Sequence, residues 1–149
     1  MKKLNKKGFT LVELLAVIVV LAIIMIIAVP AVLESMDTAK KNTLVIEGRK
    51  ALNAAMSKYQ SDVLMGTVPT LTTDPEDATK KVYCYSLSDL GVDGGGKYTG
   101  KVTIGEDKTT YKVYIGDTEY AIMGKQSSEL DPKVDTTYET SYPTTGFDC

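Results

Sequence analysis

The sequence predicts an α+β fold, in which the second half of one long N-terminal helix packs on an antiparallel sheet of three or four strands. Three observations lead to this expectation. An uncharged apolar run covers residues 14–33, and it continues into an amphipathic segment, residues 34–62, with no proline after Pro30. Short runs rich in β-forming residues, separated by turn residues, then occupy residues 82–124.

The composition argues against an enzyme. The 149 residues include 17 Lys and Arg, 19 Asp and Glu, and no His or Trp, for a net charge of −2. Histidine is the commonest general base and metal ligand, so its absence lowers the expectation of catalysis. We find no nucleophile–base set, and we expect no cofactor, no bound metal and no direct binding of nucleic acid.

The first 33 residues read as a leader and a membrane segment. Residues 1–8 are short and basic, and residues 9–33 are almost entirely apolar. About 20 uncharged residues in a helix span roughly 30 Å, the thickness of the hydrocarbon layer of a bilayer. The positive-inside tendency keeps the basic end in the cytoplasm, so we expect a single-pass protein whose bulk lies outside.

The next segment, residues 34–62, is the amphipathic half of the same helix, which we expect from Phe9 to Ser61. Pro30 lacks an amide hydrogen and should kink the helix. Apolar and small residues recur at steps of three and four and form one stripe. The stripe consists of Leu44, Gly48, Ala51, Leu52, Ala55, Met56 and Tyr59.

The rest of the chain divides into a head and a tail. Residues 63–124 form the head, a loop over 63–81 followed by runs at 82–87, 101–105, 109–116 and 119–124 that alternate as antiparallel strands do. Residues 125–149 form a tail with few aliphatic residues, which either lies over the head or is disordered. The two cysteines, Cys84 and Cys149, form one disulfide or remain two unpaired thiols.

The N-terminal stretch carries the most specific signal. A basic leader precedes Gly8, Phe9 and Thr10, and Glu13 and Pro30 are the two interruptions of a long apolar run. In these residues the chain resembles the class III signal peptide of type IV pilins and pseudopilins. The resemblance implies the pilin fold, cleavage by a prepilin peptidase between Gly8 and Phe9, and N-methylation of Phe9.

Glu13 is an acidic residue within an otherwise apolar stretch, and its position requires an explanation. A carboxylate facing lipid costs about 3 kcal/mol on insertion scales. Cleavage after Gly8 would create a partner, the α-amine of Phe9, which a neighbouring subunit could present to Glu13 during assembly. The alternative is that Glu13 lies at the membrane interface and has no role. Pro30 either marks the exit from the membrane or lets the helix loosen during repacking.

Other polar clusters are less specific. Acidic residues gather in the loops at 74–77 and 106–107, and Asp131 and Asp135 lie in the tail. Oxygen ligands suit calcium, but none of these loops has a recognisable coordination spacing, so we interpret them as solvated surface. The glycine-rich stretch at 89–96 has no following helix and reads as a turn rather than a phosphate loop.

The resemblance implies a structural subunit of a type IV pilus that supports adhesion, twitching motility or surface colonisation. Its partners would be further copies of itself, the prepilin peptidase, and the assembly platform with its ATPase. It would reside first in the cytoplasmic membrane and then in an extracellular filament. Two alternatives stay open: a pseudopilin of a type II secretion or DNA-uptake system, and a single-span membrane-anchored binding domain that does not polymerise.

Overall fold

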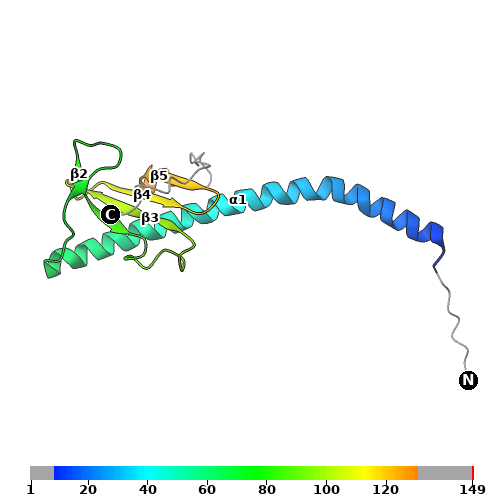
Figure 1. Cartoon of the computed structure of the whole chain (residues 1–149), viewed down its shortest axis with the longest axis horizontal. Coiled ribbons are helices and arrows are strands. Elements are labelled where there is room, and N and C mark those ends of the chain that lie inside the picture. The colour runs from blue at the N-terminus through cyan, green and yellow to red at the C-terminus, as the bar shows by residue number, and fades with distance from the viewer. Residues whose placement is uncertain (1–8, 131–148) are drawn as a thin grey trace, which may run out of the picture. The chain divides into compact units, whose positions relative to one another are not determined.

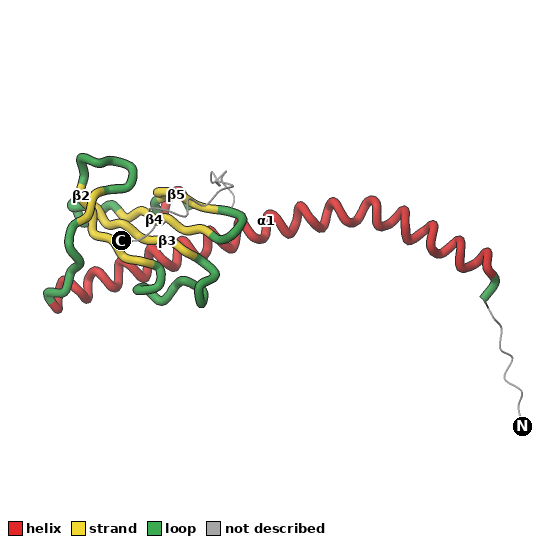
Figure 2. Tube along the Cα trace, in the orientation of Figure 1, coloured by secondary structure: helices red, strands yellow, loops and turns green. Residues whose placement is uncertain are grey.

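The computed structural model describes residues 9–130 and 149, and shows one long helix and a five-stranded antiparallel sheet (Figures 1 and 2). The helix and strands are α1 (Leu11–Met65), β1 (Thr72–Thr73), β2 (Lys81–Ser86), β3 (Thr99–Gly105), β4 (Tyr111–Gly116) and β5 (Ala121–Lys125), and a short 3₁₀ helix, η1, follows (Ser127–Glu129). The chain forms two compact units, Met1–Ala39 and Lys40–Cys149. We call the second unit the head.

The helix α1 begins and ends close to its expected bounds. It starts at Leu11 rather than Phe9 and extends to Met65, four residues past Ser61. The helix continues through Pro30. Proline has no amide hydrogen to donate to the carbonyl of Ile26, so one intrahelical hydrogen bond is missing there.

The sheet has the expected antiparallel order with one more strand than the sequence predicted. The strands lie in the order β1-β2-β3-β4-β5, each hydrogen-bonded to the next along the chain. The additional strand is β1, in which Thr72 pairs with Val82 and Thr73 with Lys81. Residues 72–73 show no strand pattern in the sequence, because two residues are too few to alternate, and only their pairing with β2 defines the strand.

The core of the head lies between α1 and one face of the sheet. The α1 stripe and the facing strand residues are almost completely buried. They include Leu44, Val45, Ala51, Leu52 and Ala55 from the helix and Val102, Val113, Ile115 and Ile122 from the sheet. Gly48 lies in this contact, since a Cβ there would be 3.5 Å from side-chain carbons of Ile115 and Leu130. Met56 is the exception to the predicted stripe, with 40% of its surface exposed.

A polar cluster fastens the end of α1 to the sheet. Asp62 is 3% exposed, and its carboxylate accepts hydrogen bonds from Lys58 Nζ at 2.8 Å, Tyr85 Oη at 3.0 Å and Thr67 Oγ1 at 3.3 Å. These donors hold the pKa of Asp62 below its usual value, the Lys58 ammonium most of all. Since they come from the helix, the following loop and β2, they fix the helix end relative to both.

The opposite face of the sheet carries the disulfide. Cys84 lies in β2, between Tyr83 and Tyr85 on the helix side, and it is bonded to Cys149. Closing a loop of 65 residues stabilises the folded state by about 4 kcal/mol on the chain-entropy model. The predicted packing of the tail, residues 131–148, lies outside the described residues.

Candidate assembly site at the start of the long helix

Thr10 and Glu13 cap the first turn of α1 reciprocally. The backbone N–H of Thr10 donates to Glu13 Oε2 at 2.8 Å, and the backbone N–H of Glu13 donates to Thr10 Oγ1 at 3.3 Å. The Thr10 hydroxyl also donates to Glu13 Oε2 at 2.8 Å. This is the capping box, in which an N-cap threonine and a glutamate three residues later each satisfy an otherwise unpaired amide of the other.

The capping box explains why α1 begins at Leu11 and not at Phe9. The Thr10 carbonyl accepts the first intrahelical hydrogen bond, from the amide of Leu14 at 3.2 Å, so Thr10 is the N-cap residue. Sequence reasoning gave Thr10 no role of its own, although the Thr-x-x-Glu spacing is readable and signals a helix start.

The cap uses only one oxygen of the Glu13 carboxylate. Both hydrogen bonds from Thr10 reach Oε2, and within residues 9–130 no hydrogen bond reaches Oε1. Both residues are exposed. As far as residues 9–130 are concerned, Oε1 of Glu13 is thus an unused acceptor, at the edge of a helix that is otherwise uncharged as far as Leu33.

The structure places the other predicted site residues as follows. Phe9 lies before the helix and is 85% exposed. Gly8, the predicted residue before the cleavage point, lies outside the described residues. Pro30 lies within α1. Among residues 9–130, the polar contacts of Glu13 are those with Thr10, and no second charged group of that range pairs with it.

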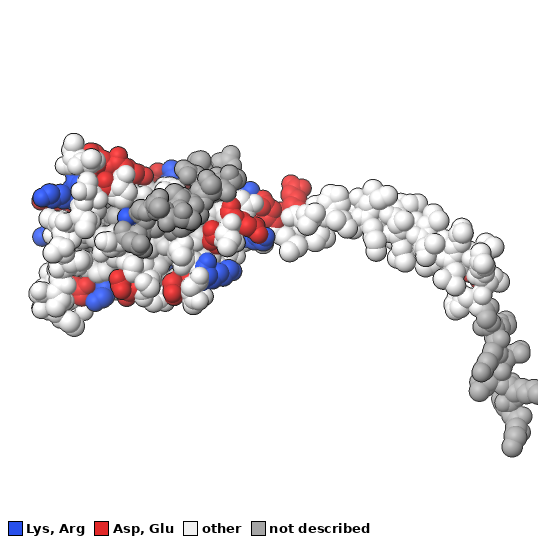
Figure 3. Space-filling model, viewed as in Figure 1, with Lys and Arg blue, Asp and Glu red and all other residues white. Residues whose placement is uncertain are grey.

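The apolar half of α1 is long and apolar enough to cross a membrane. Its most apolar 18-residue window has a mean hydropathy of 3.3, and none of that window is buried. Figure 3 shows this stretch as a surface without acidic or basic side chains, in contrast to the charged surface of the head. These properties fit a membrane-anchored protein.

The acidic loops of the head use their carboxylates locally. Asp107, in the turn between β3 and β4, accepts hydrogen bonds from the amides and hydroxyls of Thr109 and Thr110, which hold its pKa well below the usual range. Asp77 accepts two hydrogen bonds from Thr79, and its pKa falls to about 2. Across residues 9–130 and 149, no group of three potential ligands is arranged to hold a metal ion.

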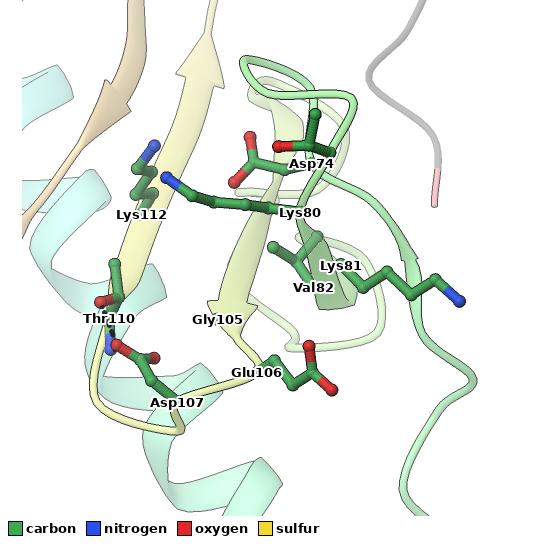
Figure 4. A pocket seen from close by; sticks show the side chains of 10 residues that line it. Asp74, Lys80, Lys81, Val82, Gly105, Glu106, Asp107, Thr110 and Lys112 are labelled. Carbon is green, nitrogen blue, oxygen red and sulfur yellow. Dashed lines mark hydrogen bonds between the residues drawn. The ribbon is translucent and has the colours of Figure 1, made fainter.

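A cavity of about 340 Å³ lies between the loop before β2 and the ends of β3 and β4 (Figure 4). Acidic and basic side chains both line it, among them Asp74, Lys80 and Lys112. Most of these groups have partners within the head: Lys112 pairs with Glu76 at 2.5 Å, and Lys80 with Asp77 at 3.2 Å. Two of the lysines that line the hollow are therefore held in ion pairs within the head.

The described residues thus form an α+β fold whose long apolar helix, capped at its start, fits a membrane-anchored protein. Residues 3–29 match the family model described as the prokaryotic N-terminal methylation motif, the class III signal peptide of type IV pilins and pseudopilins. The chain thus carries that motif, which supports a type IV pilin-like or pseudopilin protein and suggests a structural role. No curated protein and no solved structure matches the chain.

Proposed function

We propose that this protein is a structural subunit of a type IV pilus. It would polymerise through α1 after cleavage between Gly8 and Phe9 and N-methylation of Phe9. The observation that carries the proposal is Glu13 Oε1, which accepts no hydrogen bond from residues 9–130 and lies at the start of an exposed apolar helix that bears the methylation motif.

The capping box suggests how one carboxylate can serve two purposes. Oε2 stabilises the start of its own helix through Thr10, and Oε1 remains available for a positively charged donor. Cleavage after Gly8 would create such a donor, the α-amine of Phe9. Because an unpaired carboxylate in an apolar environment is costly, pairing Glu13 with the amine of a neighbouring copy would favour ordered assembly.

In this proposal the protein moves from the cytoplasmic membrane into an extracellular filament. It would first lie in the cytoplasmic membrane with its basic leader in the cytoplasm, where the prepilin peptidase acts on it. It would then pass to an extracellular filament with the help of an assembly platform and a cytoplasmic ATPase. The apolar half of α1 would be covered by lipid in the first state and by other copies in the second, and the filament would support adhesion and twitching motility.

The test is the N-terminal mass of the protein in sheared surface filaments. We expect an abundant filament protein that begins with methylated Phe9. Gly8→Val, which places a bulky residue before the cleavage point, should leave the leader attached. An uncleaved wild-type chain confined to membranes would contradict the proposal and favour a non-polymerising membrane-anchored binding domain.

A pseudopilin is the second candidate, because the matched motif is shared by pilins and pseudopilins. It predicts the same processed N-terminus. The two candidates differ in whether long filaments form on the cell surface. Electron microscopy at native expression should find such filaments for a pilin, and none for a pseudopilin of a secretion or DNA-uptake system.

A further inference from the structure

The loop between β2 and β3 contains three consecutive glycines, Gly94, Gly95 and Gly96, directly after Asp93. Their φ angles are 61°, 73° and 87°, in the left-handed region that glycine adopts without steric cost. All three glycines are exposed. The turn predicted over residues 89–96 thus has a left-handed backbone that favours glycine.

The packing of the head also favours a glycine at position 94. A Cβ built on Gly94 would lie 3.0 Å from Cδ2 and 3.2 Å from Cε2 of Tyr98. The Tyr98 side chain is 6% exposed and belongs to the hydrophobic core. A larger residue at position 94 would therefore meet both an unfavourable φ angle and the Tyr98 ring. The fold thus places a glycine after Asp93, and the sequence contains no other Asp–Gly pair.

An Asp–Gly pair is chemically reactive because of its geometry. The backbone nitrogen that follows an aspartate can attack the carbon of the side-chain carboxyl group and close a five-membered ring, a succinimide. Glycine has no Cβ to obstruct the approach, and its backbone rotates more freely than that of any other residue. Asp93 and Gly94 therefore combine the two groups that this reaction needs.

Hydrogen bonds do little to hold these two groups apart. Among residues 9–130 and 149, the Asp93 carboxylate accepts one hydrogen bond, from the amide of Gly95 at 3.2 Å, and the Gly94 amide donates to no acceptor. The Asp107 carboxylate, by contrast, accepts four hydrogen bonds from the two threonines that follow it. The bond from Gly95 directs the Asp93 carboxyl group towards the following residues and leaves the attacking nitrogen unoccupied.

We propose that Asp93–Gly94 is a site of spontaneous backbone modification in the folded protein. The Gly94 nitrogen attacks Cγ of Asp93 in its carboxylic acid form. The N–Cγ bond forms, a Cγ–O bond breaks, and the hydroxyl group leaves with the amide proton as water. Water then opens the succinimide: addition at Cγ restores aspartate, and addition at the main-chain carbonyl carbon gives isoaspartate, whose main chain runs through Cβ and Cγ. No electrons are transferred, and no further reactant is consumed.

Isoaspartate would change the hydrogen bond that closes the turn. The Asp93 carbonyl accepts a hydrogen bond of 2.9 Å from the amide of Tyr98, the residue before β3. In isoaspartate that carbonyl carbon belongs to a free carboxylate, and the main chain is one carbon longer. We therefore expect the Tyr98 amide to exchange its hydrogen faster after modification. This chemistry is independent of whether the chain polymerises.

The test is peptide mapping of the full chain after incubation in detergent at neutral pH and physiological temperature. After reduction and alkylation, trypsin releases residues 82–97 as one peptide, because Lys81 and Lys97 are its cleavage points. Asp89 lies in the same peptide, is exposed and precedes a leucine, so it is an internal control. Electron-transfer fragmentation distinguishes isoaspartate from aspartate at each position. We expect isoaspartate, preceded by a form that has lost one water, at position 93 and not at position 89.

The same chain unfolded in guanidinium chloride measures how far the fold protects the site. Because exposed loops open at almost no cost in free energy, isoaspartate should form in the folded chain at a rate within about threefold of that in the unfolded chain. A folded chain that forms none while the unfolded chain does would overturn the proposal. Equal amounts at Asp89 and Asp93 would overturn it as well.

Substitutions test the mechanism. Asp93→Glu should abolish the modification, because the same attack would close a six-membered ring, which forms far more slowly. Asp89→Glu is the matched control and should leave the yield of isoaspartate at position 93 unchanged. Asp93→Asn keeps an oxygen that can accept from Gly95, and it should react faster because its side-chain amide releases ammonia. Equal modification of the wild type and Asp93→Glu would contradict the proposed attack.

Discussion

The hydroxyl of Tyr85 donates a hydrogen bond of 3.0 Å to the buried carboxylate of Asp62 and joins the sheet to the end of α1. Tyr85 lies in β2, 23 residues further along the chain, and is 5% exposed. Burial, followed by this hydrogen bond to a carboxylate, raises the pKa of Tyr85, so the phenol stays protonated and remains a donor.

Tyr85→Phe should destabilise the head, because Asp62 then keeps a buried carboxylate with one donor fewer. We expect a fall in melting temperature on the order of 5 °C, measured on the full chain in detergent by the loss of near-ultraviolet circular dichroism. Tyr83→Phe is the matched control, since Tyr83 lies in the same strand and its hydroxyl has no hydrogen-bond partner among the described residues. Equal melting temperatures for the two variants would contradict the role of this hydrogen bond.

The stability of the head should fall in acid. The pKa values of Asp62, Asp77 and Asp107 are all lower in the folded state than the ordinary value of 3.8, and that of Asp77 is about 2. A carboxyl with a lowered pKa contributes stability that is complete above its unfolded pKa and is lost as the pH falls through its folded pKa. The free energy of unfolding should therefore be level above about pH 5 and decrease below about pH 4.

Asp107→Ala tests one of these contributions. Without the carboxylate that binds Thr109 and Thr110, the variant should be less stable at pH 7 and should lose less stability between pH 4 and pH 2. Urea denaturation of the full chain in detergent at several pH values gives both quantities. A slope against pH as steep as that of the wild type would show that Asp107 does not contribute.

Glu13→Gln distinguishes the helix-capping role of Glu13 from the role of its negative charge in assembly. Glutamine can complete a capping box with Thr10, so hydrogen exchange at the amides of the first turn should stay within about twofold of the wild type. Because the variant has no negative charge to pair with an amine, filament yield should fall by at least tenfold. Glu13→Ala should lose both properties, while processing at Gly8 continues in both variants. Normal filaments from Glu13→Gln would show that the charge is not required.

Removing the disulfide should lower stability without unfolding the core. The double variant Cys84→Ser, Cys149→Ser loses a link that closes 65 residues, worth about 4 kcal/mol on the chain-entropy model. We expect a melting temperature lower by roughly 15 to 20 °C. The unreduced wild type is the reference, and the reduced wild type should melt with the variant. Identical melting of all three samples would show that the link adds no stability.

The parts of the fold with a long, regular pattern were predicted from the sequence. The apolar run and the stripe from Leu44 to Tyr59 repeat at the period of a helix, and β2 to β5 alternate or are rich in β-forming residues, so the class, the element order and the antiparallel sheet follow. Two of the features that were missed, the start of α1 and the strand β1, have local reasons. The start of α1 depends on the hydrogen bonds of Thr10 and Glu13, and β1 is too short to leave a pattern.

The sequence by itself determined the signal at the N-terminus, because Gly8, Phe9 and Glu13 form a linear motif that is recognised by spacing alone. Tertiary structure decided everything that depends on residues distant in the chain. It brought Tyr85 to Asp62, Cys84 to Cys149, and the turn at Lys108 to the end of α1. Periodicity states which face of an element is apolar, but only packing in three dimensions determines which apolar surface is covered and which is left for a partner.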